Sequence, residues 1–237
     1  MILIPVIDLK NGAVVRAQAG RRAAYKPIRS RLCPGSSPTD VIGALLRLHP
    51  FRTLYAADLD AIEGRGDNRN ALAAIRTAFP GLDLWVDPGI KTLAGFQAWQ
   101  RLGLGSAVVG SESIASLDEW RKIRGAGAIL SLDFRRHRFL GPVPLSGSAA
   151  AWPPRIIVMS LARVGSRQGP DVTRLESVVR SAGRKNVFAA GGVRNGADLD
   201  RLARLGVAGA LVASALHDGR ITRRDIKRAA ESKMRHP

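Results

Sequence analysis

The sequence predicts an α/β fold, a single (βα)8 barrel of the TIM type that spans residues 1–237. Its 237 residues are close to the roughly 250 of a typical one-domain barrel. Short runs of β-branched and apolar residues alternate with helical patterns, which is typical of βαβ units in a parallel sheet. Because these runs number eight, the units are expected to close into a barrel.

The expected strands are the eight apolar runs in chain order. They cover Ile2–Ile7, Thr53–Ala57, Leu82–Val86, Ala107–Val109, Ala128–Leu132, Arg155–Met159, Val187–Ala190 and Ala210–Val212. The expected helices lie between and after them and carry apolar residues at helical spacing. They cover Val41–Leu48, Asn70–Ala78, Leu93–Leu102, Leu117–Arg124, Val172–Ala182, Ala197–Leu205 and Arg223–Ser232.

Capping residues support the ends of several helices. Thr92 and Ser116 stand at N-cap positions, and Glu119, three residues after Ser116, indicates a capping box. Four glycines stand where a helix would end in a left-handed residue. They are Gly103, Gly125, Gly183 and Gly206.

The two halves of the chain resemble one another. Pro88-Gly89-Ile90-Lys91 matches Gly191-Gly192-Val193-Arg194, and the same offset of 103 residues pairs Ser111 with Ser214. We therefore expect an internal duplication, with half-barrels at residues 1–125 and 126–237.

The formal net charge is +18, from 37 Lys and Arg against 19 Asp and Glu. It indicates either a phosphate-rich partner, metabolite or nucleic acid, or a generally basic surface. The charges are scattered without long basic tracts, which favours a basic surface with a local phosphate site. With Cys33 as the only cysteine, no intrachain disulfide can form, so the expected location is cytoplasmic. No apolar stretch reaches the roughly 18 residues of a membrane helix, so no membrane association is expected.

Two carboxylates follow strands on opposite sides of the expected barrel. Asp8 follows the first strand and Asp133 the fifth, and in this fold the carboxyl ends of strands carry the chemistry. Two carboxylates facing one ligand divide acid and base roles when their surroundings separate their pKa values. We interpret Asp8 as a catalytic base and Asp133 as its partner acid. The alternative is that each caps a loop or pairs with Lys or Arg.

Other polar residues near strand ends are candidate substrate contacts. Asp58-Leu59-Asp60 follows the second strand, and such a pair could bind a divalent cation. More often one Asp points into the barrel mouth while the other holds a loop, so Asp58 is expected at the substrate. No metal is expected, because the four histidines lack ligand spacing.

The loop after the first strand is basic, and Lys10 and Arg16 are its expected substrate contacts. It either closes over an anionic ligand as a lid or is a solvated surface loop. Its basic residues are Arg16, Arg21, Arg22, Lys26, Arg29 and Arg31.

Small residues follow the last three strands and predict a phosphate site. Glycine lets backbone N–H groups approach an anion, and a helix N-terminus adds a positive dipole. Phosphate sites built from the loops after strands 7 and 8 recur in this fold. The alternative is that the glycines only make tight turns. The predicted phosphate residues are Gly165, Ser166, Gly191, Gly192, Ala213 and Ser214.

A second phosphate site would mirror the first. It would use Gly89, Gly110 and Ser111. The preceding Asp87 would repel a phosphate, and Pro88 has no N–H to donate, so this site is the weaker of the two.

Together these motifs resemble the histidine-biosynthesis barrel family, which contains the phosphoribosylformimino-5-aminoimidazole carboxamide ribotide isomerase and the imidazole glycerol phosphate cyclase. The isomerase is the more similar of the two. The matching segments are Ile4–Gly12, Val15-Arg16, Ala57–Asp60, Gly89–Lys91, Val109–Ser111, Ser131–Asp133, Gly165-Ser166, Ala190–Val193 and Ala215–Gly219.

The resemblance implies duplicated half-barrels, two phosphate sites, and no metal or organic cofactor. It also implies an Amadori-type isomerisation of an aminoaldose to an aminoketose. In the family the strand-1 Asp is the base, which corresponds to Asp8, and the strand-5 Asp corresponds to Asp133.

Three segments depart from the family pattern. Val164 stands where the family usually has a catalytic Asp, Asp87-Pro88-Gly89 replaces a glycine-rich phosphate loop, and Phe134–Arg138 lacks the usual substrate-binding sequence. The whole pattern is similar to a divergent subgroup found in methanogens and methylotrophs. That similarity implies a role in one-carbon coenzyme biosynthesis rather than in histidine biosynthesis.

Three functions are therefore compared. The first is an isomerase-like enzyme acting on a phosphorylated small molecule. The second is a barrel that binds a phosphorylated ligand without catalysis, as a protein partner or regulatory subunit. The third, nucleic-acid binding, rests only on the net charge and is the least supported, because no basic face with interleaved aromatics is evident.

Overall fold

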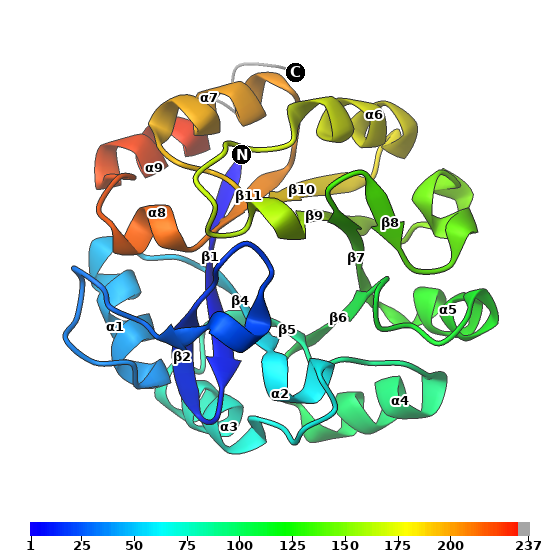
Figure 1. The fold of residues 1–237 in the computed structure, drawn as a ribbon, viewed down its shortest axis with the longest axis horizontal. Coiled ribbons are helices and arrows are strands. Elements are labelled where there is room, and N and C mark those ends of the chain that lie inside the picture. Colours follow the sequence, from blue (N-terminus) through cyan, green and yellow to red (C-terminus); the bar gives the residue numbers. More distant parts are fainter. Residues whose placement is uncertain (232–237) are drawn as a thin grey trace.

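The computed structural model describes residues 1–231 and confirms the closed eight-stranded parallel barrel (Figure 1). Around the ring the strands run β1, β4, β5, β6, β7, β9, β10 and β11, and the pairing of β11 with β1 closes it. Their bounds are β1 (Ile2–Lys10), β4 (Thr53–Asp58), β5 (Asp83–Asp87), β6 (Ser106–Gly110), β7 (Ile129–Arg135), β9 (Arg155–Ser160), β10 (Asn186–Ala190) and β11 (Gly209–Val212).

All eight predicted strands are present, with ends that differ by at most a few residues. Three short strands lie outside the ring and pair antiparallel with their neighbours. They are β2 (Ala13–Arg16), β3 (Lys26–Pro27) and β8 (Arg138–Leu140). The internal duplication stays a prediction.

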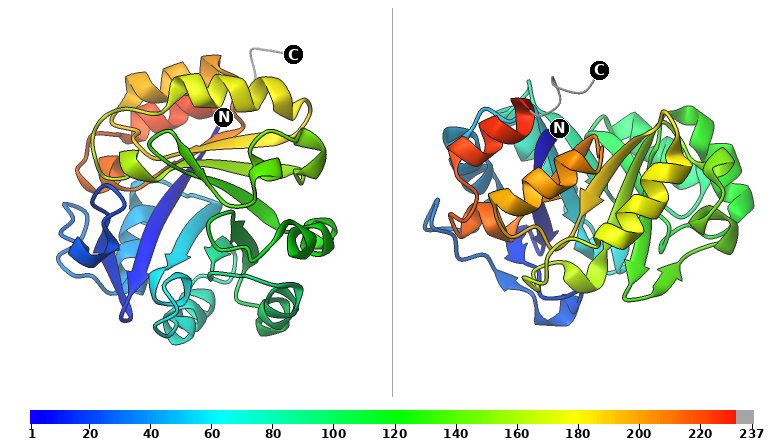
Figure 2. Two further views of the ribbon diagram at one scale, coloured as in Figure 1. Left: turned by 45° about the vertical axis from the view of Figure 1, so that its right-hand side comes forward. Right: turned by 90° about the horizontal axis from the view of Figure 1, so that it is seen from above.

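The helices surround the barrel, as Figures 1 and 2 show. The seven predicted helices correspond to α1 (Pro38–Leu48), α3 (Arg69–Ala78), α4 (Leu93–Leu102), α5 (Leu117–Ile123), α6 (Val172–Ala182), α7 (Gly196–Arg204) and α9 (Arg223–Glu231). The predicted end at Ser232 lies outside the described residues. Two single-turn helices, α2 (Leu59–Ile62) and α8 (Ser214–His217), follow β4 and β11 at the carboxyl end of the barrel.

Two details of helix capping differ from the prediction. Gly125 is not left-handed, because α5 continues into a 3-10 turn at 124–126 and the left-handed residue is Gly127. Ser116 caps the Glu119 N–H at 3.2 Å, as expected. The Glu119 carboxylate does not complete a capping box, because it accepts the Leu93 N–H of the neighbouring α4 at 2.6 Å.

The apolar side chains form two layers. One cluster fills the barrel interior with at least one residue from each ring strand, since alternate residues of a strand point inward. In it Trp85 and Phe188 meet edge to face at 5.0 Å. The larger cluster lies between the strands and the surrounding helices.

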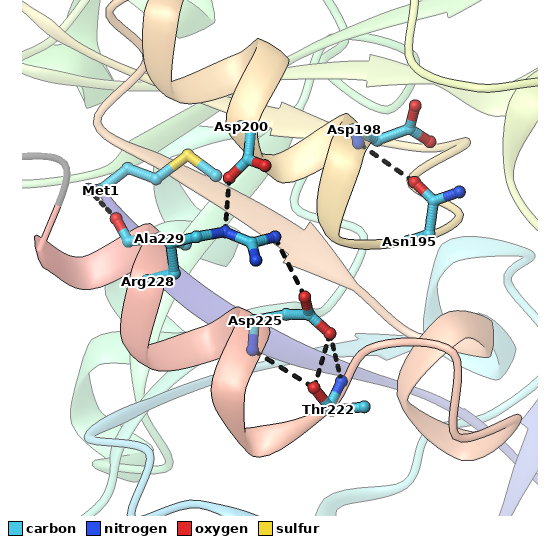
Figure 3. Close-up of polar contacts among 8 residues, drawn as sticks. All are labelled: Met1, Asn195, Asp198, Asp200, Thr222, Asp225, Arg228 and Ala229. Carbon is cyan, nitrogen blue, oxygen red and sulfur yellow. Dashed lines mark hydrogen bonds and ion pairs between the residues drawn. The ribbon is translucent and has the colours of Figure 1, made fainter.

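The amino-terminal end of the chain is fastened to the last helix. The Met1 ammonium donates to the Ala229 carbonyl oxygen at 2.8 Å, and Arg228 of α9 contacts Asp200 of α7 at 3.0 Å (Figure 3). These contacts hold α9 against α7 and β1, the strand that closes the ring.

Candidate active site

A cleft opens at the carboxyl ends of the ring strands and encloses about 1010 Å³, including the part open to solvent. Asp8, Asp87 and Asp133 line it from β1, β5 and β7. Strand alternation explains this placement, since side chains two residues apart share a face. Asp87 is two residues beyond the inward Trp85, and Asp133 is four beyond the inward Ile129.

Asp8 and Asp133, the two predicted catalytic residues, lie on opposite sides of this cleft. Three strands separate β1 from β7 in either direction around the ring. The Asp8 carboxylate makes no hydrogen bond with the described residues. Burial raises its pKa to about 7, although the Arg22 charge acts to lower it. Asp8 is therefore poised between its two protonation states near neutral pH.

Asp133 is held by a hydrogen-bond network. Its Oδ1 accepts from the Ser131 hydroxyl at 2.6 Å, and its Oδ2 accepts from the Glu112 N–H at 3.1 Å. Burial raises the pKa of Asp133 to about 8; the Ser131 hydrogen bond acts to lower it, and the nearby charges of Glu112 and Asp87 act to raise it. The side chain is therefore fixed in position and favours the protonated form near neutral pH.

Two further carboxylates line the cleft beside Asp133. Asp87 is buried, accepts the Gly89 N–H at 3.0 Å, and has its pKa raised to about 7, chiefly by burial. Glu112 forms an ion pair with Arg22. The sequence reading treated Asp87 only as an obstacle to phosphate and did not single out Glu112. Strand alternation from Trp85 was the signal that could have identified Asp87.

Two tyrosines also line the cleft and were not anticipated. Tyr55 is 3% exposed, and its hydroxyl has no hydrogen-bond partner among residues 1–231. Its pKa lies well above the ordinary value because of burial and the nearby charges of Asp87 and Asp133. Tyr25 has its pKa raised to about 12, chiefly by burial.

The basic loop after β1 contributes little of its charge to the cleft. Only Arg22 of its predicted basic residues lines the cleft, together with Tyr25. The loop crosses to the segment after β9, where the Ala19 N–H donates to the Val164 carbonyl oxygen at 2.7 Å. From this loop the Arg22 guanidinium reaches the Glu112 carboxylate in the cleft.

The loops after β9, β10 and β11 form the other side of the cleft. Of the predicted phosphate residues, Gly165, Gly191, Gly192, Ala213 and Ser214 line it. Ser166 does not, and its hydroxyl donates to the Arg163 carbonyl oxygen at 2.9 Å.

Gly192 shows why this side needs glycine. Its φ is +89°, and a Cβ there would lie 2.6 Å from the Gly169 carbonyl carbon. The backbone therefore turns tightly here, which is compatible both with the predicted phosphate site and with a purely structural turn.

Arginines surround these loops, so this side of the cleft is positive. Arg163 donates to the Gly169 carbonyl oxygen at 2.9 Å, and Arg194 pairs with Asp198 at 2.8 Å. Two more arginines at the rim, Arg167 and Arg220, lie 3.4 and 3.8 Å from the Asp218 carboxylate.

Three predicted substrate contacts do not line this cleft. Lys10 donates to the Arg22 carbonyl oxygen at 3.1 Å, and Arg16 pairs with Asp218 at 2.6 Å. Asp58 is buried and accepts the Asn68 N–H at 2.8 Å. It adjoins the inward Ala57, so its side chain leaves the strand on the opposite face. Their roles at a substrate stay predictions.

The residues of the second predicted phosphate site also lie outside the lining of the cleft. A Cβ on Gly89 would meet the Ile62 backbone at 2.8 Å, and Ser111 is fully buried. A Cβ on Gly110 would lie 3.1 Å from Asp133 Oδ2 and 3.2 Å from Asp87 Oδ2. Two carboxylates therefore occupy the space in front of Gly110, and this second site stays a prediction.

Within residues 1–231, no group of three or more His, Cys, Asp or Glu side chains is placed to hold a metal ion. In the same residues, every helix falls short of the length and apolarity needed to cross a membrane.

Known proteins resemble this chain along nearly its whole length. An uncharacterized protein of Methanocaldococcus jannaschii is 28% identical over 222 residues, covering 92% of this chain and 94% of that protein. A Rubrobacter xylanophilus protein named as an imidazole-4-carboxamide isomerase is 31% identical, and the match covers 97% of this chain and 96% of that protein. The protein of the same name from Streptococcus sanguinis is 26% identical, and the match covers 97% of this chain and 98% of that protein. Residues 2–222 match the family described as histidine biosynthesis protein. The chain belongs to this histidine biosynthesis protein family.

Proposed function

We propose that the protein is an isomerase that converts a phosphorylated aminoaldose to the aminoketose by acid–base catalysis. A phosphate of the substrate is held by the loops after β9, β10 and β11. Asp8 is the base and Asp133 the acid. The relatives named as isomerases support the reaction class.

The observation that carries the proposal is the placement of Asp8 and Asp133 in one cleft with the glycine-lined loops. An aldose–ketose rearrangement needs a base to take the C2 proton and an acid to protonate the ring oxygen as the ring opens. Efficient acid–base catalysts have pKa values near the working pH. The pKa of Asp8 is about 7 and that of Asp133 is about 8. Between these values the base is ionised while the acid still carries its proton, as the reaction requires.

We further propose a place in one-carbon coenzyme biosynthesis rather than in histidine biosynthesis, as the resemblance of the sequence motifs to the divergent subgroup implies. Divergence of the substrate from that of the named isomerases fits Val164, which lines the cleft and brings no carboxylate there. We therefore propose that the substrate is a phosphorylated compound other than that of the histidine pathway.

The test is an isomerase assay on N-substituted 5-phosphoribosylamines, including the aminoaldose ribotide of the family. Solvent deuterium entering the product reports proton transfer whatever the N-substituent. We expect turnover with a bell-shaped pH profile of kcat/KM, rising as Asp8 ionises near pH 7 and falling as Asp133 ionises near pH 8.

The matched variant is Asp8→Asn, which keeps the size of the side chain and removes the base. We expect it to abolish turnover and to retain the circular dichroism spectrum of the parent protein. Asp40→Asn, on the exposed start of α1, is the control for loss of one negative charge. Full activity in Asp8→Asn would remove Asp8 from the mechanism.

A second candidate function is a barrel that binds the phosphorylated ligand without turnover. The apolar Val164 at the lining of the cleft favours it, because the family's usual carboxylate is missing there. Phosphate binding in calorimetry together with no deuterium incorporation from any of the aminoaldose phosphates would favour this function over the isomerase.

A further inference from the structure

One side of the cleft is acidic, and we call it the acidic wall: Asp87, Glu112, Asp133 and the Tyr55 hydroxyl. Its side chains come from the strands β4, β5 and β7 and from the segment that follows β6. Around the ring β6 lies opposite β11, so the acidic wall faces the glycine-lined loops across the opening. The cleft is therefore acidic at one end and rich in arginine and backbone N–H groups at the other.

The carboxylates of the acidic wall are close together. Oδ2 of Asp133 and Oδ2 of Asp87 lie 3.1 and 3.2 Å from the position of a Cβ on Gly110, so both stand against one face of that glycine. The Asp87 Oδ2 has no hydrogen-bond partner among the described residues. Like charges this close are unfavourable unless a cation or a proton lies between them.

Arg22 is the one cation that reaches the acidic wall from the described part of the chain, and it does not balance it. Its guanidinium is engaged by Glu112. One positive charge faces three carboxyl groups, and burial raises the pKa values of Asp87 and Asp133 to about 7 and about 8, so a cation that binds beside them would stabilise their ionised forms. The wall therefore keeps a capacity for a second cation.

Tyr55 provides an observation independent of the carboxylates. Its side chain belongs to the barrel interior, is 3% exposed, and has a hydroxyl without a hydrogen-bond partner in residues 1–231. The hydroxyl oxygen itself is open to the cleft, so its hydrogen-bonding capacity is free for a ligand. Because Tyr55 lines the cleft, a ligand can supply that partner.

We propose that the acidic wall is a subsite for a protonated amine, so that the substrate carries one phosphate and one ammonium group at opposite ends. An ammonium offers three N–H donors and no acceptor, and it matches carboxylate oxygens and a hydroxyl lone pair. A second phosphate is disfavoured there, because Asp87 and Asp133 repel it and Pro88 has no N–H to donate. This inference rests on the proposed function for the phosphate at the other end.

The experiment compares ω-aminoalkyl phosphates with ω-hydroxyalkyl phosphates of three to six carbons by calorimetry on the full chain at pH 8. Lysine-like amines stay charged at this pH, since their ordinary pKa is about 10.4. We expect the amino probe of matching length to bind about tenfold more tightly than its hydroxyl counterpart, as a charge-assisted hydrogen bond would give.

Two variants locate the effect. Asp87→Asn and Tyr55→Phe should each reduce the preference for the amino probe several-fold. Asn keeps the acceptor for the Gly89 N–H, so the fold of the loop is preserved. Asp83→Asn, at the exposed opposite end of β5, is the matched control and should keep the full preference.

Equal affinity for amino and hydroxyl probes at every length would overturn the amine subsite and leave the phosphate site standing. Tighter binding of an alkane bisphosphate than of the amino probe would also overturn it, in favour of a two-phosphate substrate. Failure of inorganic phosphate and all probes to bind would overturn the phosphate site of the proposed function, and the amine subsite with it.

Discussion

At the scale of single residues, the buried carboxyl of Asp87 in the cleft lowers the stability of the folded protein. Burial of a carboxylate beside Glu112 disfavours its ionised form, and its pKa is raised to about 7. The native state therefore binds a proton that the unfolded chain has already released between about pH 4 and pH 7. Asp87 weakens the folded state increasingly as pH rises through this window.

Asp87→Asn should remove this penalty. At pH 8 we expect the variant to exceed the parent in unfolding free energy by on the order of 1–4 kcal/mol, since one pKa unit corresponds to about 1.4 kcal/mol. Near pH 4 the difference should be small, because the carboxyl is protonated in the folded state and only about half ionised in the unfolded chain. Urea unfolding at the two pH values measures it, with Asp83→Asn as control. A variant that is less stable than the parent at pH 8 would contradict the argument.

At the scale of elements, the helix ends near the cleft are fixed by side chains. Asn195 precedes α7 and accepts the Asp198 N–H at 3.1 Å (Figure 3). Asp198 in turn accepts the Arg194 N–H at 2.9 Å and pairs with its guanidinium. The cap therefore connects the start of α7 to Arg194, which lines the cleft.

Asn195→Ala should lower the unfolding free energy by about 0.5–2 kcal/mol, the usual cost of an N-cap. Asn70→Ala makes the same change at an exposed position inside α3 and should have little effect, or a slightly stabilising one, because Ala favours the helix interior. Urea midpoints of the two variants and the parent measure the difference. Equal midpoints for both variants would show that the cap contributes nothing.

At the scale of the whole molecule, the barrel interior supports the cleft from below. Each ring strand contributes an inward side chain, and Trp85 and Phe188 meet edge to face at its centre. Tyr55 belongs to this layer, so its hydroxyl is positioned by the same packing. The formal net charge of the chain is +18, and a net positive charge of this size favours the approach of anions over long range.

Phe188→Ala should cost about 3–5 kcal/mol of unfolding free energy, because it leaves a cavity in a layer that cannot collapse. Leu102→Ala, at a position that is 43% exposed, is the control and should cost far less. Guanidinium unfolding followed by tryptophan fluorescence and circular dichroism measures both. Similar losses in the two variants would mean that the interior layer is not tightly packed.

Much of the site could be predicted along with the fold, because both depend on local patterns. Strand–helix alternation located the eight strands, and their carboxyl ends located Asp8, Asp133 and the glycine-lined loops. Strand alternation also predicts that Asp87 points into the cleft, two residues after the inward Trp85, and that Asp58 points away from it, next to the inward Ala57. The error at Gly125 was local too, since a 3-10 turn extends α5 past it.

The sequence by itself determined the fold class, the family and the ring of strand ends, since alternation, spacing and motifs are properties of neighbouring residues. Only the tertiary structure decided which side chains share the cleft. Arg22 meets Glu112 across 90 residues of chain, and Asp87 meets Asp133 in front of Gly110, because the ring closes. The acidic wall and the partnerless Tyr55 hydroxyl therefore arise from closure of the ring, which brings residues distant in the chain together at one end of the cleft.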